Sequence, residues 1–220
     1  PLIKAMEENK NALGEHETAE DIVTKARKNA KTIMWCLIVA AVVVVGVLAW
    51  IFVAQNGSRK ADELIAKADA ATTDSVAIEL YQKAADAGYK SGNRAKAELG
   101  ILYYQKGDYE KALTYLNDCS LNDDIAEAGV ETLRGDCYVN LEKYAEALDC
   151  YDDAIDAADE NPQIVPFVLI KMAHIYRQQG EYAKEAKAYE TILDDYPTYV
   201  NGTRADIRRY YERAKAQAGE

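Results

Sequence analysis

The chain has 220 residues, with 37 Asp and Glu against 26 Lys and Arg, and a formal net charge of −11. Residues 1–54 carry equal numbers of acidic and basic side chains, so all of the net charge lies in residues 55–220. Such an acidic body repels phosphate backbones, which argues against a nucleic-acid-binding protein.

Residues 1–32 form a polar N-terminal tail with few apolar side chains. Their loose spacing predicts two weak helices that are mobile in isolation. The first strong feature follows the tail. Residues 33–54 contain no charged residue, no Pro, no Asn and no Gln.

This apolar segment predicts one transmembrane helix. At about 1.5 Å per residue, 22 helical residues measure about 33 Å, which matches a hydrocarbon core of about 30 Å. The segment is longer than the apolar core of a secretory signal, so we expect a retained anchor in contact with membrane lipid. Small side chains predict a helix–helix contact face. Its residues are Cys36, Ala40, Ala41, Gly46 and Ala49.

The orientation of this helix depends on the flanking positive charges. Lys and Arg number four in residues 25–31 and three in residues 59–67. The excess favours a cytoplasmic N-terminus and a body on the far side of the membrane. We expect residues 55–58 (Gln-Asn-Gly-Ser) to form an exit turn, after which the pattern is helical to the end.

The body repeats one pattern about every 35 residues. Tyr81, Leu116, Tyr151 and Tyr189 are 35, 35 and 38 residues apart. The two middle copies have a small residue on the first helix and another on the second, which lets two short antiparallel helices pack closely. One such pair cannot bury its apolar face alone, so neighbouring pairs must stack. The small residues are Gly100, Gly135 and Ala173 on first helices, and Ala77, Ala112 and Ala147 on second helices.

These spacings resemble the tetratricopeptide repeat over residues 59–197. Its signature positions are matched by Leu99, Gly100, Tyr103, Ala112 and Leu116. The resemblance implies an all-α protein: one transmembrane helix, then an α-solenoid of about four helix pairs in residues 55–203, then a capping helix in residues 204–220.

Two residues depart from the repeat pattern. Glu142 replaces a turn glycine, and Glu185 occupies a position where the other copies have a small residue.

The sequence offers no catalytic constellation. The body has one histidine, His174, and three cysteines. Because three is an odd number, these cysteines cannot all pair with one another in disulfides. We expect Cys119, Cys137 and Cys150 to be buried apolar residues. No nucleotide-binding motif and no calcium loop is present. We therefore expect no enzyme, no cofactor, no metal and no small-molecule substrate.

The resemblance implies that the first helices line a concave groove for a peptide or a partner helix. One subtype clamps a terminal carboxylate with Lys and Asn, but the matching positions here are Ala97 and Ile101, which argues against a clamp. The expected groove residues are Arg94, Ala97, Ile101, Tyr104 and Gln105, then Thr132, Asp136, Val139 and Asn140, then Phe167, Ile170, Lys171, His174 and Arg177.

The whole layout, an N-terminal tail, one span and degenerate repeats, is similar to the YfgM family of ancillary Sec translocon subunits. That resemblance implies a bacterial inner-membrane protein with a periplasmic body. Its partners would be Sec translocon subunits, periplasmic chaperones or exported chains. The alternative is a receptor or assembly adaptor whose repeats face the cytosol, which three unpaired cysteines suit slightly better.

Overall fold

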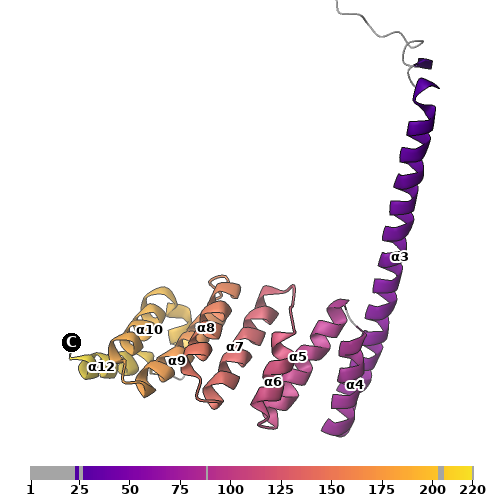
Figure 1. Ribbon diagram of the computed structural model, residues 1–220. Coiled ribbons are helices and arrows are strands. Elements are labelled where there is room, and N and C mark those ends of the chain that lie inside the picture. The colour runs from indigo at the N-terminus through magenta and orange to yellow at the C-terminus, as the bar shows by residue number, and fades with distance from the viewer. Residues whose placement is uncertain (1–22, 25–26, 88, 203–205, 220) are drawn as a thin grey trace, which may run out of the picture. The chain divides into compact units, whose positions relative to one another are not determined.

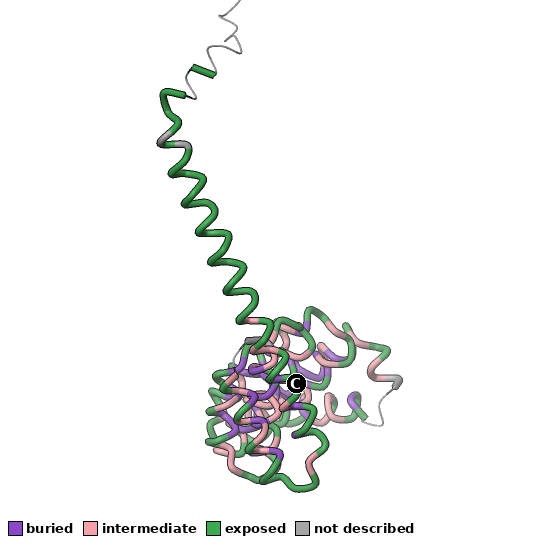
Figure 2. Tube along the Cα trace, turned by 90° about the vertical axis from the view of Figure 1, so that its right-hand side faces the viewer, coloured by how far each residue is buried: buried purple, intermediate pink, exposed green. Residues whose placement is uncertain are grey.

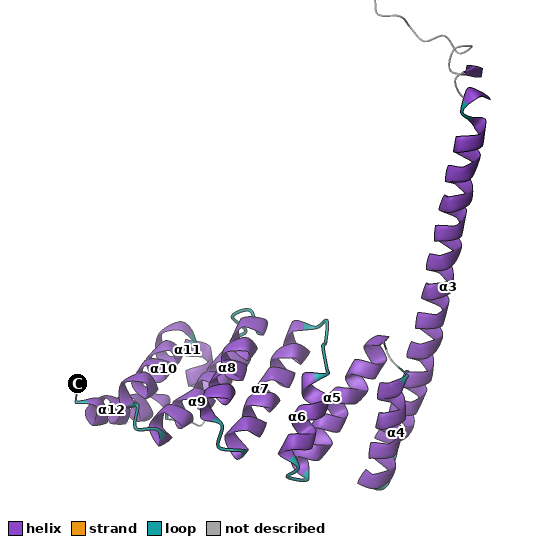
Figure 3. Ribbon diagram, in the orientation of Figure 1, coloured by secondary structure: helices purple, strands orange, loops and turns teal. Residues whose placement is uncertain are grey.

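The computed structural model describes residues 23–24, 27–87, 89–202 and 206–219, and within these residues all regular structure is helical (Figure 3). Most of the polar tail, residues 1–22 and 25–26, lies outside the described residues, so the two weak helices expected there are described only in short helical pieces at residues 23–24 and 27–28. The chain divides into two compact units, residues 1–54 and 55–220.

Helix α3 extends from Ala30 to Asp69 without a break. The expected exit turn at residues 55–58 is therefore wrong. A single helical glycine, Gly57, costs only about 1 kcal/mol relative to Ala, and strong helix formers on either side continue the hydrogen-bond ladder through it.

The apolar part of α3 is long and apolar enough to cross a membrane, as judged by length and composition. None of the side chains in its most apolar stretch is buried (Figure 2). This is the arrangement expected of a segment whose natural surroundings are lipid, and equally of an N-terminal signal.

The body is a stack of antiparallel helix pairs (Figure 1). The end of α3 packs with α4 through Ala61 and Ile65. The later helices are α4 (Asp74–Asp86), α5 (Tyr89–Gln105), α6 (Tyr109–Asn117), α7 (Asp124–Asn140), α8 (Tyr144–Ala157), α9 (Ile164–Gln178), α10 (Tyr182–Asp195), α11 (Pro197–Gly202) and α12 (Ile207–Ala218). The pairs are α5 with α6, α7 with α8 and α9 with α10, as the repeat pattern predicts.

Glycines allow the closest approach within two of these pairs. A Cβ on Gly100 would overlap the side chain of Leu116, and a Cβ on Gly135 would overlap the ring of Tyr151. Leu116 and Tyr151 are themselves almost completely buried. The spacing of small and large residues in the repeats is therefore a consequence of close helix packing.

Three equivalent turns between paired helices use a left-handed residue. Gly107 and Gly180 have φ of +76°, and Glu142 takes the same conformation with φ of +59°. Glycine adopts this conformation without steric cost, whereas a residue with a Cβ does not. The departure at Glu142 thus changes the residue but not the turn.

Helix α12 covers the last pair with Ile207 and Ala214, which are buried. It begins at residue 207 rather than at 204, because Asp206 is its N-cap and accepts a hydrogen bond from the backbone N–H of Arg209. Residues 203–205 lie outside the described residues.

Candidate protein-binding groove

A groove of about 520 Å³ lies over the first helices of successive pairs. Helices α5, α7 and α9 supply most of its lining, with additions from α6 and the α6–α7 connection. It is lined by Ala97, Ile101, Leu116, Leu121, Ile125, Ala126, Gly129, Val130, Thr132, Leu133, Asp136, Ile164 and Phe167.

Large exposed apolar side chains converge on this groove. Within the described part of the body these side chains are Val76, Ile101, Ile125 and Phe167, and the last three line the groove. Their exposed fractions are 37%, 59% and 49%. Apolar groups gathered in a concave site indicate a binding surface, whereas single scattered ones do not.

Five of the expected groove residues lie in this lining: Ala97, Ile101, Thr132, Asp136 and Phe167. The other nine lie outside it: Arg94, Tyr104, Gln105, Val139, Asn140, Ile170, Lys171, His174 and Arg177. The groove is therefore centred nearer to the N-terminal half of α7 than the repeat positions suggest.

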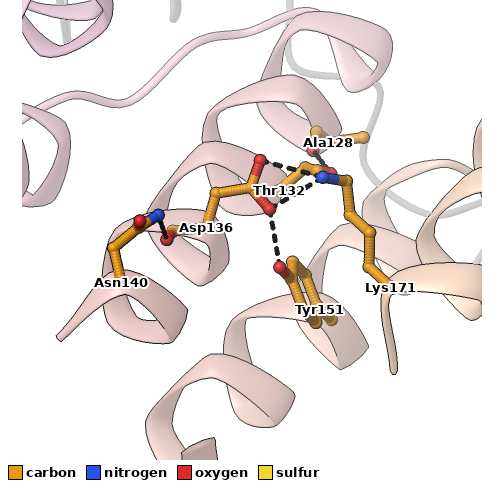
Figure 4. A network of polar contacts seen from close by, with 6 residues as sticks. All are labelled: Ala128, Thr132, Asp136, Asn140, Tyr151 and Lys171. Atoms are coloured by element: carbon orange, nitrogen blue, oxygen red, sulfur yellow. Dashed lines mark hydrogen bonds and ion pairs between the residues drawn. The ribbon is translucent and has the colours of Figure 1, made fainter. Parts of the chain in front are cut away.

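Asp136 is held in a network of polar contacts (Figure 4). Lys171 Nζ lies 2.8 Å from Asp136 Oδ1 and 2.9 Å from Oδ2. The hydroxyl of Tyr151 donates to Oδ1 at 2.6 Å, and the side-chain amide of Asn140 donates to the Asp136 carbonyl oxygen at 2.8 Å. Asp136 and Lys171 thus join α7 to α9 through an ion pair.

Two other expected contact residues are also engaged within the protein. Thr132 donates a hydrogen bond to the carbonyl oxygen of Ala128 at 2.7 Å. Tyr104 packs edge-on against Tyr109, with ring centroids 5.6 Å apart. Burial, and then the negative charge of Asp136, raise the pKa of Tyr104. The groove is consequently an apolar surface beside polar side chains that are engaged within the protein.

A family model of the tetratricopeptide repeat-like domain matches residues 61–177, which is more than half of the chain. This chain belongs to the tetratricopeptide repeat-like family. A second tetratricopeptide repeat model matches residues 167–199. The matched residues include the whole groove, so the groove lies on the repeat scaffold itself.

A known protein of Arabidopsis thaliana is similar to part of this chain. This chain is 33% identical over 111 residues to Protein KINESIN LIGHT CHAIN-RELATED 3 of Arabidopsis thaliana, which is 46% of this chain and 17% of that protein. The chain thus spans less than a fifth of this relative's length.

Two solved structures are similar to this chain. The crystal structure of MamA has a TM-score of 0.50 at 19% identity and covers 76% of this chain and 92% of MamA. A MamA mutant has a TM-score of 0.48 at 20% identity, and the match covers 77% of this chain and 82% of the mutant chain.

Sequence reasoning missed the N-terminal half of the α7 surface. Leu121, Ile125, Gly129 and Leu133 all line the groove, and they are spaced by four residues. Helix α7 begins at Asp124, whereas the first groove position expected on it is Thr132, so the expected positions do not reach Ile125. The four-residue spacing itself was the signal that could have identified this face.

The expected contact face on the apolar part of α3 is not one face. At 100° per residue in a continuous helix, Ala40 and Ala49 are nine residues and about 180° apart. Cys36 shares a side with Ala40, whereas Gly46 shares a side with Ala49. A single small-residue stripe is therefore absent from this helix.

The body thiols and His174 show no arrangement for catalysis. Cys119, Cys137 and Cys150 are free and buried. Burial raises the pKa of Cys119 and of Cys150 to about 11, so these thiols are protonated and inert at pH 7. Desolvation and the neighbouring Arg177 lower the pKa of His174. No group of three or more metal-ligating side chains occurs among the residues described.

Proposed function

We propose that this protein is a membrane-anchored scaffold that holds exported proteins or periplasmic chaperones beside the Sec translocon. The proposal depends on the resemblance to the YfgM family and on one observation above all. Three of the four large exposed apolar side chains in the described body meet in one groove of the repeat scaffold. The apolar part of α3 would anchor that groove at the inner membrane.

The groove supports weak and reversible capture. Ile101, Ile125 and Phe167 are each about half exposed, so complete burial of each would contribute about 1 kcal/mol. The total is comparable to the cost of ordering a flexible partner, which favours micromolar or weaker binding. Short residence suits a scaffold that passes proteins on.

A cytosol-facing receptor or assembly adaptor is the second candidate. It is favoured by three free thiols in the body, since reducing compartments keep thiols unpaired. All three are buried, however, and a buried thiol persists in either compartment.

Membrane topology separates these candidates. The native body cysteines are buried, so an exposed probe is needed, and Ser120→Cys supplies one in the α6–α7 connection. A membrane-impermeant maleimide on intact spheroplasts should label this variant but not the parent. Labelling only after the membrane is permeabilised would contradict the periplasmic proposal.

Partner association tests the translocon part. We expect the native protein, purified in mild detergent, to carry Sec subunits together with exported chains or chaperones. The double variant Ile125→Ser with Phe167→Ser should lose the exported chains or chaperones, whereas Val76→Ser, an exposed apolar residue outside the groove, should retain them. Absence of Sec subunits from the native preparation would contradict the proposed location.

A further inference from the structure

The negative charge of the body is concentrated in one segment. Residues 107–165 carry 16 Asp and Glu but only 3 Lys and Arg. Residues 55–106 carry 7 acidic and 8 basic side chains, and residues 166–220 carry 8 and 9. The acidic segment contains α6, α7 and α8, and it supplies ten of the thirteen groove-lining residues.

Part of this charge lies at one end of the groove. The α6–α7 and α8–α9 connections lie at the same edge of the solenoid (Figure 1). Asp123 and Asp124 directly precede the groove residue Ile125, and Asp159 and Glu160 shortly precede Ile164. All four acidic side chains are exposed.

Packing between α7 and α9 keeps these two connections together. Ala128 on α7, Ala158 at the end of α8 and Val165 on α9 form one buried cluster. The two acidic pairs, which we call the acidic rim (Asp123, Asp124, Asp159 and Glu160), therefore flank a common groove end.

The acidic rim is not neutralised within the described part of the chain. Its four carboxylates take part in no ion pair there, and Asp123 only caps α7 by accepting from the backbone N–H of Ala126. Two Lys side chains on the helices that contact α7 are engaged with other carboxylates: Lys96 on α5 with Asp118 at 2.6 Å, and Lys171 on α9 with Asp136 at 2.8 Å. An approaching ligand therefore meets apolar side chains beside uncompensated negative charge.

We propose that the occupant of this groove is a protein segment whose large apolar side chains are flanked by Lys or Arg. The apolar side chains would bury Ile101, Ile125 and Phe167, while the flanking cations would lie against the acidic rim. Acidic segments would be repelled. This inference rests on the proposed function and adds the chemical class of its ligand.

Synthetic peptides test the charge preference directly. The full chain in a non-ionic detergent is titrated against fluorescent 15-residue peptides that share one Leu- and Phe-containing centre. In three of these peptides the two residues on each side of the centre are Lys, Glu or Ser, respectively. A fourth peptide has Lys flanks and a centre of Ser and Gln in place of the apolar one. At 50 mM NaCl we expect the Lys-flanked peptide to bind about 10-fold tighter than the Glu-flanked one. At 500 mM NaCl the ratio should fall to about twofold.

Removal of the acidic rim should remove the preference. The variant is Asp123→Asn, Asp124→Asn, Asp159→Asn and Glu160→Gln. Asn still caps α7 and tolerates the left-handed backbone at residue 159. Affinity for the Lys-flanked peptide should fall about 5- to 10-fold while the Ser-flanked peptide binds as before. The control changes Asp152, Asp153, Asp194 and Asp195 to Asn, which removes equal charge from exposed sites elsewhere.

Two results would overturn the inference: equal affinity for Lys- and Glu-flanked peptides, or an equal loss in the charge-matched control. Either would leave the proposed function standing if Phe167→Ser still weakened binding of every peptide with an apolar centre. If no peptide bound in a manner sensitive to Phe167, the groove would not be the binding site and the proposed function would fail as well.

Discussion

The carboxylate of Glu185 on α10 lies 2.8 Å from the guanidinium of Arg213 on α12, and Glu185 is wholly buried. Glu185 occupies a position that is Ala112 or Ala147 in the two preceding pairs. The capping helix thus supplies the cation for a charge that would otherwise be buried alone.

Loss of one partner of the Glu185–Arg213 ion pair should therefore lower the free energy of unfolding far more than loss of both. Arg213→Met leaves a buried carboxylate unpaired and should lower the free energy of unfolding of the last pair by about 3–5 kcal/mol. The double variant with Glu185→Ala restores the small residue of the other pairs and should recover most of this loss.

Amide hydrogen exchange in α10 and α12 measures the local stability of these helices. A local measurement is needed because stacked repeats can unfold independently of one another. Equal protection in the single and double variants would show that the ion pair does not couple the two helices.

Two glycines on α7 should respond oppositely to alanine. In Gly135→Ala the new Cβ overlaps the Tyr151 ring, so we expect a loss of about 1–3 kcal/mol in unfolding free energy. In Gly129→Ala the Cβ has no atom within 4 Å, and the gain in helix propensity should stabilise by up to about 1 kcal/mol. Thermal unfolding followed by far-ultraviolet circular dichroism gives both values. Similar shifts of the two variants would argue against close approach of α7 and α8 at Gly135.

Glycine at position 142 should stabilise the α7–α8 turn. Glu142 has φ of +59°, a conformation that costs a side-chain-bearing residue about 1–2 kcal/mol and costs glycine none. The greater freedom of glycine in the unfolded chain offsets part of the gain, so Glu142→Gly should add about 0.5–1 kcal/mol. Glu146→Gly, at an exposed site in α8, should instead destabilise by a similar amount. Thermal unfolding of both variants checks the sign, and a destabilised Glu142→Gly would contradict this account of the turn.

Glu98 should make stability decrease as pH rises. Desolvation raises the pKa of Glu98 above its ordinary value, while Arg94 opposes the shift and Asp69 adds to it. Because the folded protein binds the proton more tightly than the unfolded chain, the contribution of Glu98 is complete below about pH 4.5 and is lost as pH rises through its folded pKa.

Relative to the parent, Glu98→Gln should therefore raise the melting temperature more at pH 7 than at pH 4. Melting temperatures of variant and parent at both pH values measure this difference. Glu63→Gln is the control. The pKa of Glu63 is lowered by Lys67, so that substitution should have the opposite sign. A melting-temperature difference between Glu98→Gln and the parent that does not change with pH would contradict the assignment.

The repeat pattern predicted the fold because packing constraints are local in sequence. Gly100 with Leu116 and Gly135 with Tyr151 are fixed by close approach within one helix pair, so their spacing is visible in the chain. The continuity of α3 through Gly57 was not predictable from turn residues, because helices on both sides impose their geometry on a short polar stretch.

The site was predicted only in part because its polar residues have partners in other repeats. Asp136 was expected to line the groove, but its ion pair with Lys171, 35 positions away, could not be seen in the local pattern. The same applies to Glu185 and Arg213, which are 28 positions apart. Apolar groove residues such as Ile125 were missed because they precede Thr132, the first groove position expected on α7.

The central claim is that partner proteins bind in the groove over α5, α7 and α9. A photo-crosslinking amino acid placed at position 125 in intact cells tests it most directly, with position 76 as the exposed apolar control outside the groove. We predict ultraviolet-dependent adducts with exported chains or a chaperone from position 125 and none from position 76. Adducts from position 76 alone, or none from position 125, would contradict the claim.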